Sequence, residues 1–311
     1  MAWIALSLDM LRLTGDSTVA DEIELATFNA GIGGQSPSGR WWTYNTPMEG
    51  EKKAAAHDIN FQCRPGSPEL NCCSVNGPRI LGMLSEWCLM TAGGAPLAAE
   101  GLALNYYGPC ELSAQLPGGA AVMLRQETDY PRSGVIRIRV SVERPLRFGL
   151  RLRIPAWSAQ TQVRVNGRRV PAQQSAYLAL NRTWKDGDRI ELSLDMSPHL
   201  WLGEAVRRLR EGVRGKASVY HGPVLLAYDP RFNEVSFEQL APLRADDVRP
   251  QPLTWEQWPQ PWLLLEFAGA DGKPVRLCDF ATAGMTGTAY HTWLRVDGAD
   301  SSRQCFRPPS H

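Results

Sequence analysis

The sequence lacks an excess of charge of either sign, and it lacks any long apolar run. Its 311 residues include 33 basic and 32 acidic side chains, which give a formal net charge of +1. A near-neutral chain lacks the electrostatic attraction that usually brings a protein to nucleic acid, so we expect no nucleic-acid partner. No apolar run approaches the roughly 18 residues of a membrane-spanning helix, so we expect no membrane partner.

Several signatures of common protein classes are also missing. Residues 1–13 are apolar but have no basic start and contain Asp9, so we do not interpret them as a signal peptide. The sequence has no glycine-rich phosphate loop between a strand and a helix, no G-x-S-x-G and no H-E-x-x-H. The cysteines number seven and two are adjacent, which favours thiols or a metal site over a disulfide framework. Together these features favour a cytoplasmic protein.

The hydrophobic pattern changes its period near residue 100. Before it, helical spacing predicts helices from 3 to 15, from 17 or 18 to about 31–34, and from 78 to about 93, around an irregular stretch at 35–71. In the second helix we expect the face that includes Ile23 and Ala30 to be apolar.

Beyond residue 100 the pattern is that of strands. Alternating runs at 135–142 and 148–154, and a hairpin around Asn166-Gly167, indicate an antiparallel β-sandwich with one solvated face. On that face we expect four arginines, as a solvated surface rather than a nucleic-acid stripe. These are Arg137, Arg139, Arg151 and Arg153.

The expected fold is therefore α+β and multidomain. Residues 1–100 would form a helical domain, residues 101–200 a β-sandwich, and residues 201–311 a second sandwich or the completion of the first.

The strongest candidate for chemistry is the pair Cys72-Cys73. The pair lies at the start of a predicted helix, where the helix dipole favours the thiolate, and Arg79 adds a positive charge nearby. Thiolates are also soft ligands that suit zinc. The pair is thus a candidate nucleophile or metal site, and the alternative is two buried thiols that pack as small hydrophobic groups.

Other residues in the irregular stretch are weaker candidates. Cys63 could be a third metal ligand, and His57 could be a ligand or a base, or else an exposed or capping residue. Tyr44 could bind a sugar hydroxyl while Trp41 or Trp42 stacks on the sugar; the alternative is that these aromatic residues anchor the loop.

Taken together, these residues resemble glycoside hydrolase family 127, the β-L-arabinofuranosidase-like proteins. The double cysteine combined with Ile-Pro-x-Trp and Val-Asn-Gly is the most specific part of the resemblance. The matching segments are Leu13-Thr14-Gly15-Asp16, Trp42-Thr43-Tyr44-Asn45-Thr46-Pro47, Asn71-Cys72-Cys73, Pro78-Arg79, Leu152-Arg153-Ile154-Pro155-Ala156-Trp157, Val165-Asn166-Gly167, His221-Gly222-Pro223 and Asp279-Phe280-Ala281-Thr282-Ala283-Gly284, with Tyr290 and Trp293.

The resemblance implies a fold, a cofactor and a mechanism. Residues 1–100 would be the last helices of an (α/α)6 barrel, followed by β-sandwich domains. Cys72 matches the catalytic nucleophile and also binds zinc, Cys73 matches a second zinc ligand, and Tyr44 resembles a tyrosine near the substrate. Beside Tyr44 we also expect Trp42 and His57 to bind the substrate. The implied reaction is retaining hydrolysis of a β-L-arabinofuranoside or a related plant glycan, with the thiolate in place of the usual carboxylate.

The sequence also departs from this family. No Glu-x-Cys, the family's other pair of zinc ligands, precedes the double cysteine, and too few helices precede it for a complete barrel. We therefore expect the C-terminal portion of a longer protein, with little or no activity of its own. We also expect its helices to expose apolar faces, for example those of Ile23 and Ala30, and these faces to promote self-association. The alternatives are a non-catalytic carbohydrate-binding sandwich and a structural zinc protein.

Overall fold

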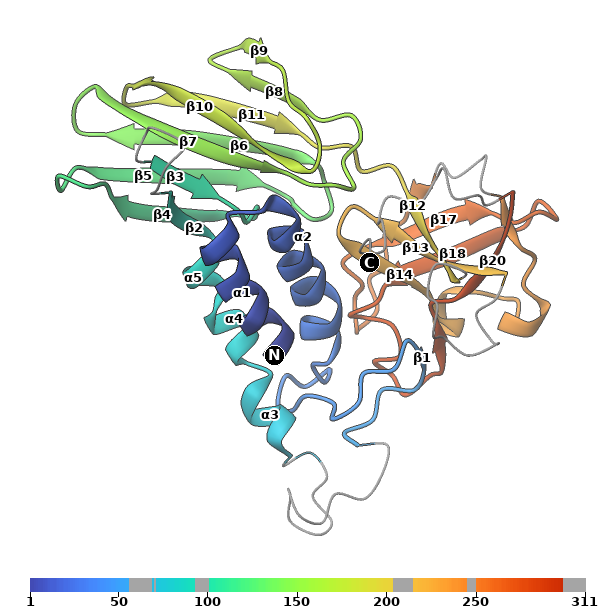
Figure 1. The fold of residues 1–311 in the computed structure, drawn as a ribbon. Helices are drawn as coiled ribbons and strands as arrows, with labels where there is room; N and C mark the ends of the chain where they lie inside the picture. The colour runs from blue at the N-terminus through green and yellow to red at the C-terminus, as the bar shows by residue number, and fades with distance from the viewer. Residues whose placement is uncertain (56–68, 70, 93–100, 204–214, 245–249, 299–311) are drawn as a thin grey trace. The chain divides into compact units, whose positions relative to one another are not determined.

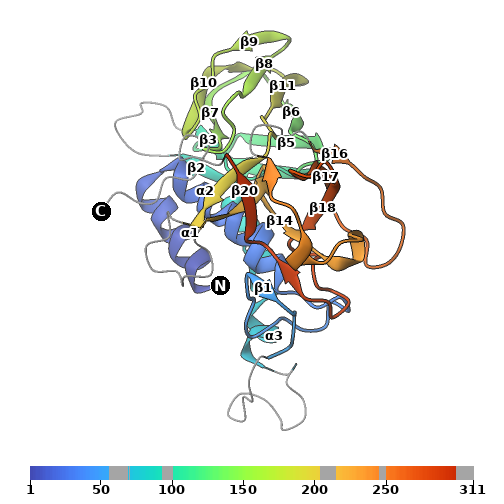
Figure 2. The same ribbon diagram turned by 90° about the vertical axis from the view of Figure 1, so that its right-hand side faces the viewer.

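The computed structural model describes residues 1–55, 69, 71–92, 101–203, 215–244 and 250–298 (Figures 1 and 2). These residues divide into two compact units. The first unit comprises residues 2–24 and 82–196, and the second comprises residue 1 with residues 25–81 and 197–311.

The first unit combines helices with two sheets. A six-stranded sheet has the order β4-β5-β6-β11-β8-β9, and a four-stranded sheet has the order β10-β7-β3-β2. All paired strands are antiparallel except β3 and β7, which are parallel. The elements are α1 (Ala2–Thr14), α2 (Ser17–Ala26, which crosses into the second unit), β2 (Leu89–Ala92), β3 (Gly101–Leu104), β4 (Cys110–Gln115), β5 (Ala121–Thr128), β6 (Val135–Val142), β7 (Leu146–Ile154), β8 (Gln162–Val165), β9 (Arg168–Val170), β10 (Ala176–Trp184) and β11 (Asp188–Ser193).

The sandwich follows the predicted alternation of side chains. In β6, Ile136, Ile138 and Val140 are buried while the residues between them are exposed. The hairpin between β8 and β9 turns at Asn166 and Gly167, whose φ angles of 49° and 79° are those of the predicted type I′ turn. The prediction of helices followed by mostly antiparallel sheets is therefore confirmed.

One of the four arginines does not lie on the solvated face. Arg137 and Arg139 are exposed, but Arg153 in β7 is 0% exposed. Its guanidinium binds Asp21 and Glu24 of α2, which are also buried. The prediction for Arg153 was wrong because strict alternation assumes one wet face, whereas this part of β7 is covered on both sides.

The second unit is built on a ten-stranded sheet. Its main path is β15-β20-β13-β14-β18-β17-β16, with β1, β12 and β19 attached to it. Buried apolar side chains form two clusters, one including Val219, Leu226 and Leu277 and the other including Phe232 and Phe280. The strands are β1 (Glu49–Gly50), β12 (His199–Leu202), β13 (Lys216–His221), β14 (Val224–Tyr228), β15 (Leu243–Arg244), β16 (Gln251–Pro252), β17 (Leu264–Ala268), β18 (Pro274–Asp279), β19 (Tyr290–His291) and β20 (Leu294–Asp297).

A π-helical turn joins α2 to this sheet. The turn η1 (Thr27–Gly31) places Asn29 against the start of β14. Asn29 donates from Nδ2 to the Pro223 carbonyl at 2.9 Å and accepts at Oδ1 from the Leu225 amide at 2.8 Å. The 3₁₀ turns η4 (Pro230–Phe232) and η5 (Phe237–Gln239) follow β14.

The predicted third helix is broken into pieces. Three short helices occupy this stretch, and the residues after them form strand β2 instead of continuing the helix to residue 93. The three helices are α3 (Cys72–Asn76), α4 (Arg79–Gly82) and α5 (Leu84–Trp87).

The apolar helix face that we expected to be exposed lies elsewhere. Ala30 is exposed, but Ile23 is 0% exposed, so the prediction for Ile23 was wrong. The exposed apolar residues are instead on α1: Trp3 (56%), Leu6 (55%), Met10 (42%) and Leu13 (82%). Their spacing places them on one side of the helix. None of the helices described here is both long and apolar enough to cross a bilayer.

Candidate functional site

The two adjacent cysteines begin a short, well-capped helix. Asn71 precedes α3, and its side-chain oxygen accepts hydrogen bonds from the amides of Cys73 (2.8 Å) and Ser74 (3.2 Å). The Ser74 hydroxyl donates to the Glu69 carbonyl at 2.5 Å. At the other end, Asn76 donates to the Cys72 carbonyl at 2.9 Å. These bonds fix the backbone that carries both thiols.

The two thiols lie next to each other and differ in exposure. Cys72 is exposed and Cys73 is half-buried, and their sulfur atoms are 3.9 Å apart. Burial, together with the neighbouring Cys72 thiol, raises the pKa of Cys73 to about 11. Cys73 is therefore a thiol at neutral pH unless a cation stabilises its thiolate.

The spacing of these sulfurs fits part of a zinc site. Two sulfurs bound to zinc at about 2.3 Å in a tetrahedron are about 3.8 Å apart, close to the observed separation. Within the described residues, however, no group of three or more His, Cys, Asp or Glu side chains could hold a metal ion. Cys72 and Cys73 thus match two corners of a zinc site, but these residues do not complete it.

The loop that precedes α3 is tied to it by Trp42. The Trp42 amide donates to the Ser74 hydroxyl at 3.2 Å, and its ring Nε1 donates to the Gly31 carbonyl at 3.1 Å. The Trp42 ring also lies directly against Gly77, where an added Cβ would come within 2.3–2.5 Å of the ring atoms. Gly77 therefore allows the loop and α3 to pack closely.

The far end of this loop is held by the C-terminal strands. Strand β1 pairs with β19, and the Thr292 hydroxyl donates to the Met48 carbonyl at 2.8 Å. Lys52 donates from Nζ to the carbonyls of Phe280 (2.8 Å) and Ala281 (2.6 Å). Burial lowers the pKa of Lys52 to about 8. The C-terminal sheet thus positions the loop that carries Trp42 and Tyr44.

The structure brings only some of the predicted site residues together. Cys72, Cys73 and Trp42 lie close together around α3. Tyr44 is half-buried and its amide donates to the Ala54 carbonyl at 2.8 Å. His57, like Cys63, lies outside the described residues. Trp42 is 8% exposed. Its packing makes it an anchor of the loop, and its role at a substrate remains a prediction.

One Glu-x-Cys sequence follows the double cysteine, at Glu86-Trp87-Cys88. Glu86 accepts a hydrogen bond from Arg12 at 2.9 Å, and Cys88 is buried, which raises its pKa to about 12. Because Glu86 is paired with arginine and the buried Cys88 thiol is inert, these two residues do not form a pair of zinc ligands.

Sequence reasoning assigned no structural role to three residues that shape the site. Asn71 caps α3, Gly77 admits the Trp42 ring, and Lys52 anchors the loop. Of these, Asn71 could have been found, because an asparagine before a helix start is a common N-cap. Lys52 could not, since its acceptors are backbone carbonyls more than two hundred residues away in sequence.

Comparisons with known proteins match most of the chain. Residues 1–86 match the family model described as the catalytic domain of GH127 β-L-arabinofuranosidase, and residues 101–196 match its GH127 middle domain. Together the two matches span more than half of the chain. No curated protein matches it.

Solved structures share the fold. One titled as a glycoside hydrolase is 24% identical, with a TM-score of 0.76, and the match covers 94% of this chain and 51% of that one. A GH127 β-L-arabinofuranosidase from Geobacillus stearothermophilus T6 is 20% identical with a TM-score of 0.74, covering 95% and 49%. A further GH127 β-arabinofuranosidase is 21% identical with a TM-score of 0.72, covering 95% and 48%.

The chain spans about half the length of each of these structures. The two family matches lie in the same order as the helices and the first sandwich of the fold. The chain therefore belongs to the GH127 β-L-arabinofuranosidase family, with part of the catalytic domain and the middle domain.

Proposed function

We propose that this chain is the part of a retaining β-L-arabinofuranosidase that supplies the nucleophile, Cys72. The observation that carries the proposal is the exposed Cys72 sulfur on a capped helix, 3.9 Å from the Cys73 sulfur. Both cysteines fall within the catalytic-domain match at 1–86. An exposed, rigidly held thiol is accessible to a substrate, which a buried packing residue is not.

The proposed chemistry is a double displacement. The Cys72 thiolate attacks the anomeric carbon, a carbon–sulfur bond forms, and the bond to the departing oxygen breaks with its electron pair on that oxygen. A glutamic acid that the matched segments of this chain do not supply would protonate the departing oxygen. Water then cleaves the thioglycosyl bond and returns the thiolate. Tyr44, Trp42 and His57 are the proposed substrate-binding residues.

Cys72 and Cys73 are also the proposed zinc ligands in the complete site. A bound zinc ion would keep the sulfur deprotonated at neutral pH. Because the described residues offer only these two donors, the isolated chain is expected to bind zinc weakly and to hydrolyse glycosides slowly or not at all.

Two further features belong to this proposal. The apolar residues along α1 would pair with those of a second copy of the chain, because such a stripe is costly to leave in water. The domains would run over residues 1–100, 101–200 and 201–311, as the change of sequence period indicates. A cytoplasmic location stays a prediction.

The nucleophile can be tested without the missing acid. A 2,4-dinitrophenyl β-L-arabinofuranoside has a leaving group that departs without a proton, so Cys72 can be glycosylated in this chain with zinc added. We expect mass spectrometry of peptides to find a pentosyl group on Cys72. The Cys72→Ser variant should lose this adduct, and the matched control Cys110→Ser should retain it.

The same experiment separates the alternatives. If no adduct forms, or if it forms equally in Cys72→Ser, Cys72 is not the nucleophile. Sugar binding that survives Cys72→Ala and Cys73→Ala, with no adduct in the wild type, would favour a carbohydrate-binding module. Unfolding of the chain by a chelator would favour a structural zinc protein.

A further inference from the structure

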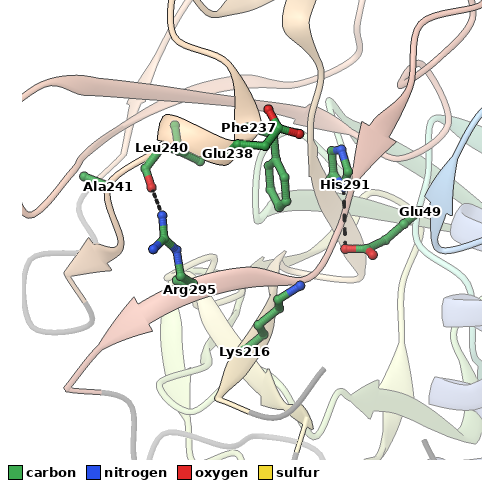
Figure 3. A pocket seen from close by; sticks show the side chains of 8 residues that line it. All are labelled: Glu49, Lys216, Phe237, Glu238, Leu240, Ala241, His291 and Arg295. Carbon is green, nitrogen blue, oxygen red and sulfur yellow. Dashed lines mark hydrogen bonds and ion pairs between the residues drawn. The ribbon is translucent and has the colours of Figure 1, made fainter. Parts of the chain in front are cut away.

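The C-terminal sheet contains a pocket of about 390 Å³ that the proposed hydrolysis does not use (Figure 3). Its volume is at the lower end of the range for small-molecule sites, which run from about 300 to 1,000 Å³. Charged and aromatic side chains from five separate elements line it. They are Glu49 (β1), Lys216 (β13), Phe237 and Glu238 (η5), His291 (β19) and Arg295 (β20).

Two cations stand side by side in this pocket. Lys216 and Arg295 are directly opposite each other on the antiparallel strands β13 and β20, so their side chains share one face of the sheet. Like charges at opposed positions repel each other and destabilise a sheet. Among the side chains described, neither cation forms an ion pair, and Arg295 donates to the Leu240 carbonyl. An anion between the two cations would remove the repulsion.

The opposite wall offers fixed acceptors. Glu49 Oε1 and His291 Nδ1 are buried and face each other at 3.8 Å, as the dashed line in Figure 3 indicates. Burial opposes ionisation of Glu49, but His291 and Lys216 together hold the pKa of this carboxyl below its ordinary value. Glu238 adds a second carboxylate, exposed at the rim. Ionised carboxylates only accept hydrogen bonds, so they require a ligand with donors.

An aromatic wall completes the pocket. The Phe237 and His291 rings stack at 3.6 Å with an interplanar angle of 4°. The Tyr228 ring packs against Phe237, with the ring centres 5.4 Å apart. The stack holds the His291 ring, and hence the Glu49 carboxylate, in a fixed position, so the pocket is formed before any ligand arrives.

We propose that this pocket binds an acidic sugar of monosaccharide size. Its carboxylate would lie between Lys216 and Arg295, and its hydroxyl groups would donate to Glu49 and Glu238. A ligand with several anionic oxygens and few donors, such as phosphate, would be repelled by the two carboxylates. A neutral sugar would bring no negative charge to Arg295, which donates to the neutral Leu240 carbonyl. The site is independent of Cys72, so it does not rest on the proposed hydrolysis.

The test compares ligands that differ in one group. Isothermal titration of the purified chain with D-galacturonate, D-galactose and inorganic phosphate separates the carboxylate from the hydroxyls. We expect galacturonate to bind at least about tenfold more tightly than galactose or phosphate, as loss of a charged hydrogen bond predicts. Galactose binding as tightly as galacturonate, phosphate binding as tightly, or no galacturonate binding would each overturn the proposal.

Variants then locate the site. Lys216→Gln removes one pocket cation and should weaken galacturonate binding about tenfold or more. Lys273→Gln is the matched control, because Lys273 is exposed on the turn between β17 and β18. Lys216→Arg keeps the charge and should retain binding, which distinguishes lost recognition from misfolding. Equal affinities of Lys216→Gln and Lys273→Gln would overturn the assignment to this pocket.

Discussion

Arg153 Nη2 donates a hydrogen bond to Glu24 Oε1 at 2.6 Å, and both side chains are fully buried. The same guanidinium binds Asp21 and donates from Nε to the Asn105 carbonyl at 2.7 Å. Glu24 also accepts from the Tyr130 hydroxyl at 2.6 Å. Since these bonds connect α2 with strand β7 and its neighbours, the helix is attached to the sandwich by charge as well as by apolar contact.

Removal of the guanidinium should destabilise the first unit strongly. Arg153→Met leaves Asp21 and Glu24 buried with no cation, and breaking a buried ion pair on one side typically costs about 3–5 kcal/mol. Urea unfolding followed by circular dichroism measures the loss. Arg137→Met, on the exposed face of β6, is the matched control and should change stability little. Equal effects of the two substitutions would show that the buried network does not stabilise the fold.

Stability should also depend on pH through Asp21. Burial raises the pKa of Asp21 from its ordinary value of 3.8 to about 6, despite the opposing attraction of Arg153, because two carboxylates share one guanidinium. The folded chain therefore holds more protons than the unfolded chain between about pH 4 and 6. The free energy of unfolding should therefore increase as the pH is lowered from about 6 to about 4. The same contribution is lost as the pH is raised through the folded pKa of about 6.

The variant Asp21→Asn isolates this effect. The variant has no ionisable group at this position. When the pH is lowered from 7 to 5, the free energy of unfolding of the wild type should therefore increase relative to that of the variant. Asp9→Asn, at an exposed position, should show no such shift. A difference that stays constant between the two pH values would contradict the raised pKa.

The sandwich strands could be predicted from sequence because their signal is local. In β6 the buried residues alternate with exposed ones. In the β8–β9 hairpin, Asn166 and Gly167 are residues that readily adopt the positive φ angles of the turn. Arg153 could not be placed from this pattern. Its partners Asp21 and Glu24 lie more than one hundred residues earlier, and alternation alone cannot reveal that a helix covers the strand.

The reactive residues of the site could be predicted from sequence, but the contacts that hold its loop in place could not. The adjacent cysteines identified α3, and their shared helix brings the sulfurs together without long-range packing. The loop that holds Trp42 and Tyr44 is instead fixed by Lys52 and by pairing of β1 with β19, contacts that no sequence spacing encodes. The third predicted helix failed after Trp87 for a similar reason, since residues 89–92 pair with β3.

Self-association should depend on α1. Leu6 and Leu13 are 55% and 82% exposed on the same side of the helix, so a double substitution to lysine adds charge without touching the core. If two copies pair through this stripe, sedimentation velocity should show wild-type oligomers and a monomeric variant. Met123→Lys, at a residue 37% exposed on β5, is the control and should leave the oligomers unchanged. A monomeric wild-type chain would refute pairing through α1.

Lys52 should control the order of the loop that leads to the two cysteines. Its half-buried side chain donates from the ammonium group to the carbonyls of Phe280 and Ala281. Lys52→Met keeps the length of the side chain but leaves both carbonyls without this donor, which should cost about 1–3 kcal/mol. Hydrogen exchange at the amides of residues 42–54 should rise relative to that of β6, whereas Lys53→Met, at an exposed neighbour, should not change it. Unchanged protection of this loop in Lys52→Met would mean that the pairing of β1 with β19 holds it without the lysine.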